Sequence, residues 1–156
     1  MKDFGDLETG DLLALGRRAL ELEARRLREI AAGADPVDRP LRELLHHMAL
    51  ESERCAAQVK REEVVRADDA RPAHSPEQGL RLITGYVQSL AKSFGEGPLL
   101  RDAALFLAES LEEEISRLCR ALAEHAKDWK VNRLFVELAE RERNNVHFLR
   151  EVVLAW

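Results

Sequence analysis

The stretch "LFVELAERERNNVHFL", residues 134–149, carries the pattern that decides the fold. Its apolar residues recur every three or four positions, which is the spacing of one face of an α-helix. A glutamate, Glu142, interrupts this row between Leu138 and Val146. A carboxylate on an apolar face is costly to bury unless it is protonated, hydrogen-bonded, paired or bound to a cation. The stretch therefore predicts a core-facing helix that carries a buried acid group.

Three other segments show the same arrangement, with one glutamate in each apolar row: Glu23, Glu53 and Glu112. The row predicted around Glu53 consists of Leu45, Ala49, Glu53, Ala56 and Ala57. Four acid groups at one level of a core need cations, because like charges at close range otherwise drive some of them to take up protons.

An internal repeat supports this common level. Thirteen residues of the range 19–64 are identical to the residues 89 positions further on. The same offset relates Glu23 to Glu112 and Glu53 to Glu142. The repeat predicts two similar helical hairpins with their glutamates at equivalent depth.

Helix start and stop signals divide the chain into four long helices and a shorter one. The long helices are predicted from about Thr9 or Asp11 to Gly33, from just after Asp38 to Val65, from about Leu99 to Ala126, and from about Asp128 or Trp129 to the C-terminus. The shorter one is predicted between Ser75 and Phe94. These lengths predict a single all-α domain over residues 1–156, a four-helix bundle of two hairpins with the short helix as the crossover.

Composition agrees with an all-helical protein and disfavours some classes of binding partner. Only 5% of the residues are aromatic, and the net charge is −5 with both signs interleaved, which disfavours nucleic acid as a partner. No apolar run approaches the roughly 20 residues of a membrane span, and the N-terminus lacks the apolar core of a signal peptide. We expect a cytoplasmic protein that does not enter membranes. The two cysteines, Cys55 and Cys119, are isolated in sequence and are expected to be buried thiols.

The segments "ESLEEEISRLCRALAEHAKD" and "LFVELAERERNNVHFL" give the chain its resemblance to the rubrerythrin branch of the ferritin-like superfamily. That resemblance implies two hairpins joined by a long crossover, and a homodimer. It also implies two metal ions, iron or manganese, bound by a glutamate on the first and third helices and by Glu-x-x-His on the second and fourth. By position the ligand glutamates correspond to Glu23, Glu53, Glu112 and Glu142.

The chain departs from that family at both histidines. Ala56 and Asn145 stand at the two positions, and no rubredoxin-like CxxC module is present in the sequence. Asn145 is nevertheless a candidate ligand through its carbonyl oxygen. The remaining set is rich in carboxylates and favours hard cations such as iron, manganese, magnesium or calcium.

Two hypotheses for the function follow. In the first, the chain is a ferritin-like metal-binding protein with a carboxylate-only di-metal site, and an oxidoreductase that handles peroxide, oxygen or iron. In the second, it is a degenerate, non-catalytic bundle that serves as a structural or protein-interaction module. Arg26 then neutralises carboxylates in place of the metal, because it lies three residues after Glu23.

Overall fold

Four long helices make up the part of the chain that the computed structural model describes, residues 8–66 and 99–155. They are α1 (Thr9–Gly33), α2 (Arg39–Val65), α4 (Arg101–His125) and α5 (Trp129–Ala155). Within these ranges the chain is all helical and forms no strand, apart from an isolated bridge between Ala34 and Leu99. The predicted long helices are confirmed to within two residues at the ends that the sequence signals defined. The predicted crossover helix at 75–94 lies outside the described residues.

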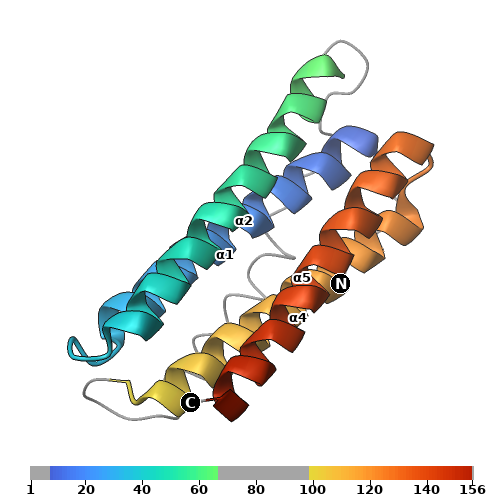
Figure 1. Ribbon diagram of the computed structural model, residues 1–156. Coiled ribbons are helices and arrows are strands. Elements are labelled where there is room, and N and C mark those ends of the chain that lie inside the picture. Colours follow the sequence, from blue (N-terminus) through green and yellow to red (C-terminus); the bar gives the residue numbers. More distant parts are fainter. Residues whose placement is uncertain (1–7, 67–98, 156) are drawn as a thin grey trace.

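The helices pair as two hairpins, α1 with α2 and α4 with α5 (Figure 1). Between the hairpins, the backbones approach most closely where α1 packs on α4, whereas α2 and α5 are joined through longer side chains. Leucine and alanine side chains of all four helices form one core between them. Burial of these apolar rows, rather than helix propensity alone, stabilises helices of this length.

Helix α1 also approaches α5 closely at Gly16. A Cβ atom placed on Gly16 would lie 2.4 Å from Cε1 and 2.8 Å from Cζ of Phe135, whose side chain is fully buried. Only a residue without a side chain fits between the two helices at this level.

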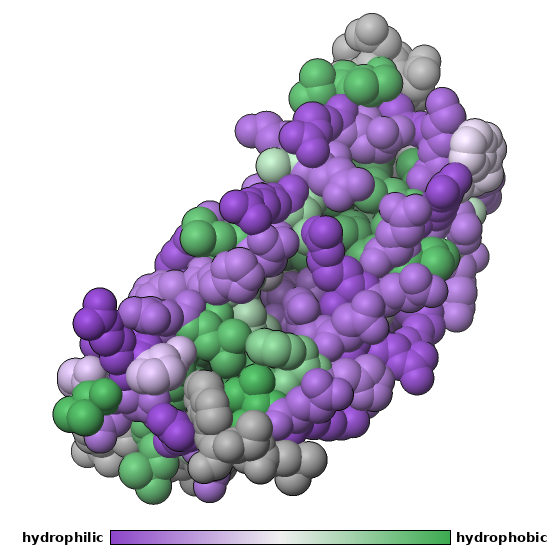
Figure 2. Space-filling model, in the orientation of Figure 1, coloured by the Kyte–Doolittle hydropathy of each residue, from purple (hydrophilic) through white to green (hydrophobic). Residues whose placement is uncertain are grey.

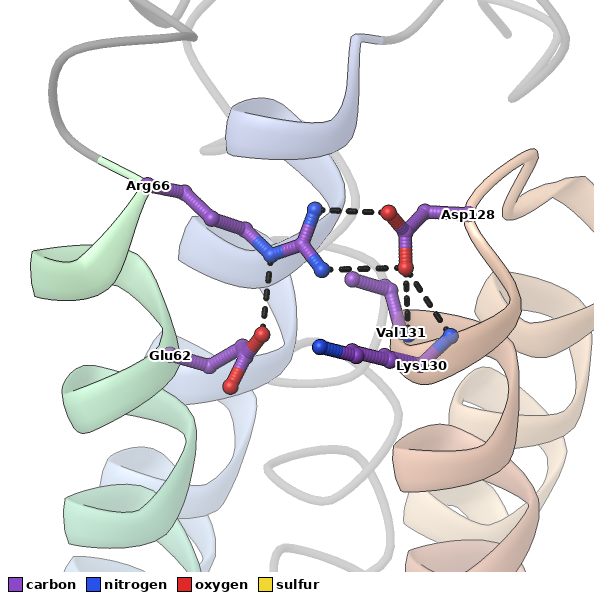
Figure 3. A network of polar contacts seen from close by, with 5 residues as sticks. All are labelled: Glu62, Arg66, Asp128, Lys130 and Val131. Carbon is purple, nitrogen blue, oxygen red and sulfur yellow. Dashed lines mark hydrogen bonds and ion pairs between the residues drawn. The ribbon is translucent and has the colours of Figure 1, made fainter.

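Two aspartates join the hairpins near opposite ends of the helices. Asp38 caps the start of α2 through the Leu41 amide and binds Arg101 of the other hairpin, with N–O distances of 2.6 and 2.7 Å. Asp128 binds Arg66 at 2.8 and 3.0 Å (Figure 3). Each arginine presents two donors to one carboxylate, which fixes the relative position of the two hairpins.

The outer faces of the helices are mostly hydrophilic. In the view of Figure 2, apolar side chains show mainly along the seam between the hairpins and near the ends of the molecule. None of the described helices contains a segment that is long and apolar enough to span a bilayer.

Candidate metal centre

Three of the predicted glutamates meet in the core. Glu23 of α1, Glu112 of α4 and Glu142 of α5 are exposed by only 0%, 0% and 1%. One carboxylate oxygen from each lies within 4.8 Å of those from the other two. We call Glu23, Glu112 and Glu142 the glutamate cluster. The structure therefore brings together three carboxylates from three helices and both hairpins.

Two neutral side chains contact the cluster. The hydroxyl of Ser52 on α2 lies 2.9 Å from Oε1 of Glu23 and 3.1 Å from the backbone oxygen of Met48, and it donates to one of them at a time. The half-buried Asn145, one turn after Glu142, donates from Nδ2 to Oε2 of Glu112 at 3.4 Å. Asn145 thus lies at the cluster, as predicted, and reaches it as a hydrogen-bond donor.

Three buried oxygens of the cluster, one on each glutamate, have no donor in the described part of the chain. Oε2 of Glu23, Oε1 of Glu112 and Oε2 of Glu142 are buried, and no hydrogen-bond donor of the described residues reaches them. A buried carboxylate oxygen without a donor is unfavourable by roughly 1–3 kcal/mol or more. These oxygens need protons shared among the carboxyls or a cation.

The electrostatics of the cluster reflect this crowding. Burial, followed by the charge of Glu112, raises the pKa of Glu23 well above its ordinary value of 4.5. Burial and the charges of Glu23 and Glu112 likewise raise the pKa of Glu142. Burial also raises the pKa of Glu112, whereas hydrogen bonds, including the one from Asn145, oppose that rise. In the absence of a cation the cluster therefore retains protons at a pH where free glutamates have lost them.

The predicted inward position of Glu53 is wrong. Its side chain is 46% exposed and pairs with Arg28 on the surface of the first hairpin. Arg28 lowers the pKa of Glu53, as expected for an exposed carboxylate beside a cation. The geometry therefore separates Glu53 from the other three glutamates.

The reason is helical geometry. The predicted row from Leu45 through Ala49 to Glu53 takes two consecutive four-residue steps, which together turn about 80° around the helix axis. Alternating steps of four and three residues stay on one face, and they lead from Leu45 through Ala49 to Ser52. Ser52 is 3% exposed and is therefore the α2 residue that points toward the cluster.

Burial also corrects the register of the repeat on these two helices. Seven of the eight buried positions of α2 correspond to buried positions of α5 at an offset of 90, not 89. In order, Leu41, Leu45, Met48, Ala49, Ser52, Ala56 and Val59 match Val131, Phe135, Leu138, Ala139, Glu142, Val146 and Leu149. At this offset Ser52 corresponds to Glu142, and Cys55 to Asn145. The α2 residue that corresponds to Asn145 is therefore Cys55, and not Ala56, which the offset of 89 had paired with it.

Cys55 has a charged neighbour. Nη1 of Arg141, the residue before Glu142, lies 2.7 Å from Sγ of Cys55, a contact that joins α5 to α2. Burial raises the pKa of the Cys55 thiol, and the guanidinium opposes that rise. Both cysteines are buried free thiols, as predicted. The contacts made by Ser52, Cys55 and Arg141 were not predicted, although the four-three spacing of apolar residues on α2 marks Ser52 in the sequence.

Arg26 does not take the role proposed for it. Its Nη1 pairs with Glu29, one turn further along α1. None of the described arginines bonds to a carboxylate of the cluster. In this structure Arg26 therefore does not neutralise the cluster.

The donor set fits a hard cation. Carboxylate oxygens are typical ligands of magnesium, calcium, manganese and iron, and the cluster offers three of them with a total charge of −3 when ionised.

Protein-family models, curated proteins and solved structures were compared with the chain, and none matches it significantly. The function is therefore inferred from the residues of this chain.

Proposed function

We propose that this protein binds a divalent transition-metal ion, iron or manganese, in its core through Glu23, Glu112 and Glu142. The observation that carries the proposal is the set of three buried carboxylate oxygens, one on each glutamate, that no donor of the described residues satisfies. A cation bound among them would replace the missing hydrogen bonds and remove the repulsion between the three charges.

The resemblance to rubrerythrins supports iron or manganese over magnesium and calcium, and it supports a ferritin-like bundle and a homodimer. Asn145 is placed to support the site. Rotation of its amide group by about 180° exchanges the nitrogen for the carbonyl oxygen, which is a ligand for hard cations. An iron ion in such a site supplies redox chemistry toward oxygen or peroxide, and we propose an oxidoreductase or iron-handling role on that basis.

Metal binding is tested with protein purified without chelator. Titration with ferrous iron under nitrogen, and with manganese, is followed by calorimetry and by elemental analysis after desalting. Glu142→Gln keeps the shape of the side chain and removes a charge, so it should lower the affinity at least tenfold. Glu53→Gln removes the same charge from an exposed position and should leave the affinity unchanged.

The alternative function is a metal-free structural bundle, which the close approach of the three buried carboxyls allows. Three carboxyls that share protons can hydrogen-bond to one another and need no cation. If the parent protein binds neither metal at micromolar concentration, and Glu142→Gln is at least as stable as the parent, this alternative replaces the metal site.

Redox activity is tested separately from metal binding. Peroxide consumption by the iron-loaded parent is compared with that of Glu142→Gln at the same iron concentration. Turnover that is lost with Glu142→Gln and retained with Glu53→Gln would support an oxidoreductase. Equal rates in all three samples would assign the consumption to iron in solution.

A further inference from the structure

The two halves of the metal centre are unequal. At the offset of 90 that matches the buried positions of α2 and α5, Glu142 and Asn145 on α5 correspond to Ser52 and Cys55 on α2. At these positions α5 carries a carboxylate and an amide, whereas α2 carries a hydroxyl and a thiol. Sequence identity alone hides this difference, because the offset of 89 aligns Glu53 with Glu142.

We infer that the centre is built for a single metal ion, held from α1, α4 and α5, and that the side facing α2 is closed to a second ion. This inference rests on the proposed metal-binding function and specifies its stoichiometry. It departs from the two-ion arrangement that the resemblance to rubrerythrins implies.

The spacing of the carboxylates supports one ion. Manganese or iron with oxygen ligands at about 2.1 Å holds neighbouring oxygens about 3 Å apart and opposite oxygens about 4.2 Å apart. The three oxygens of the cluster already lie within 4.8 Å of one another, so a small inward movement closes them around one ion. Three carboxylates also leave one negative charge after a single divalent ion is bound, whereas two such ions would leave an excess of positive charge.

The contacts of α2 argue against a second ion. Two metal ions about 3.5–4 Å apart need ligands on both sides of the pair. Ser52 offers only a neutral hydroxyl, whose hydrogen bonds already involve Glu23 and the Met48 carbonyl. At Cys55 the guanidinium of Arg141 lies 2.7 Å from the sulfur, which places a positive charge at this side of the centre. A second cation would lack an anionic ligand there and would be repelled by Arg141.

The experiment counts ions and tests their spacing. Manganese is titrated into the chelator-free parent, and bound manganese is followed by electron paramagnetic resonance. We expect one equivalent per chain, with the hyperfine pattern of isolated ions at saturation. Two equivalents with the spectrum of exchange-coupled ions would overturn the inference and leave the metal-binding function standing. No bound manganese or iron would overturn the proposed function and the inference together.

Two variants test whether the residues facing the centre from α2 limit it to one ion. Ser52→Glu combined with Arg141→Ala adds a carboxylate on α2 and removes the opposing charge, so the folded variant should take up two equivalents with a coupled signal. A folded variant that still binds one would contradict the role assigned to α2. Glu53→Gln is the matched control and should keep one equivalent, since Glu53 lies on the surface. If the double variant does not fold, the parent's stoichiometry and spectrum decide the matter.

Discussion

The Ser52 hydroxyl oxygen lies 2.9 Å from Oε1 of Glu23, and this contact joins α2 to the glutamate cluster. Among the described residues, it is the one hydrogen bond to Glu23 from a side chain outside the cluster. The other oxygen of Glu23 has no donor there. Ser52 can donate to an ionised Glu23 or accept a hydrogen bond from a protonated one, because a hydroxyl does both.

Ser52→Ala should therefore weaken the centre without dismantling the fold. The buried Oε1 of Glu23 would lose its donor, at a cost of roughly 1–3 kcal/mol in the free energy of unfolding. Removal of the donor also raises the pKa of Glu23 further and lowers metal affinity at pH 7. Urea denaturation and manganese titration measure the two effects.

Ser116→Ala is the matched control for this variant. Ser116 is also a buried serine, and its hydroxyl donates to the backbone oxygen of Ala139 at 3.1 Å rather than to a glutamate. The Ser116→Ala variant should be less stable than the parent and should bind metal with the same affinity. Equal loss of affinity in both serine variants would show that Ser52 acts through packing alone.

The sequence predicted the helices well because their signals are local. Asp38 and Asp128 precede their helices and accept hydrogen bonds from amides of the first turn, which is the capping chemistry expected of aspartate. The apolar row through Leu138, Glu142 and Val146 likewise specified the buried face of α5.

The error at Glu53 has a physical cause. Four-residue and three-residue steps are both helical, so a short row can be followed along two faces that diverge by about 100° between adjacent residues. Identity at the 89-residue offset favoured the wrong face, since surface residues such as Arg54 and Arg143 contributed to it. The pairing of Arg28 with Glu53 links residues 25 positions apart, and no local pattern indicates it.

The stability of the metal-free protein should fall as pH rises above about 5. Burial raises the pKa values of Glu23 and Glu142 above 4.5, so between 4.5 and the raised values the folded state holds protons that the unfolded chain has released. Each such proton lowers the free energy of unfolding by about 1.4 kcal/mol per pH unit. Chemical denaturation with chelator present, at several pH values from 5 to 9, measures the slope.

The Glu23→Gln, Glu142→Gln double variant should flatten this slope, because the amides do not titrate. Bound metal should reverse its sign, since cations compete with protons for the carboxylates and bind more tightly as pH rises. A parent slope that matches the double variant's over the whole range would show that the cluster is ionised without metal.

The contact between Arg66 and Asp128 should stabilise the packing of the two hairpins. Arg66 lowers the pKa of Asp128, so this contribution is present above pH 4 and is lost as pH falls through the lowered value. Asp128 also accepts hydrogen bonds from the amides of Lys130 and Val131 (Figure 3). Asp128→Asn retains the capping oxygen and should lower the melting temperature less than Asp128→Ala, which removes both roles.

Salt distinguishes the two roles of Asp128. The ion pair is partly exposed and is screened by added salt, whereas capping by an amide oxygen is not. The difference in melting temperature between the parent and Asp128→Asn should therefore shrink in 1 M sodium chloride. A difference that does not change with salt would assign the effect to capping geometry rather than to charge.

Gly16→Ala should destabilise the fold although alanine is the better helix former. The added Cβ would lie 2.4 Å from Cε1 of Phe135, whose ring is fully buried in the core. Overpacking of this kind costs about 1–3 kcal/mol, which exceeds the gain of up to about 1 kcal/mol in helix propensity.

Gly33→Ala is the control, because the nearest atom to its added Cβ is Leu99 Cδ1 at 3.4 Å. In a double-mutant cycle, Phe135→Leu should recover part of the loss caused by Gly16→Ala, and strict additivity would contradict the close approach of α1 to α5.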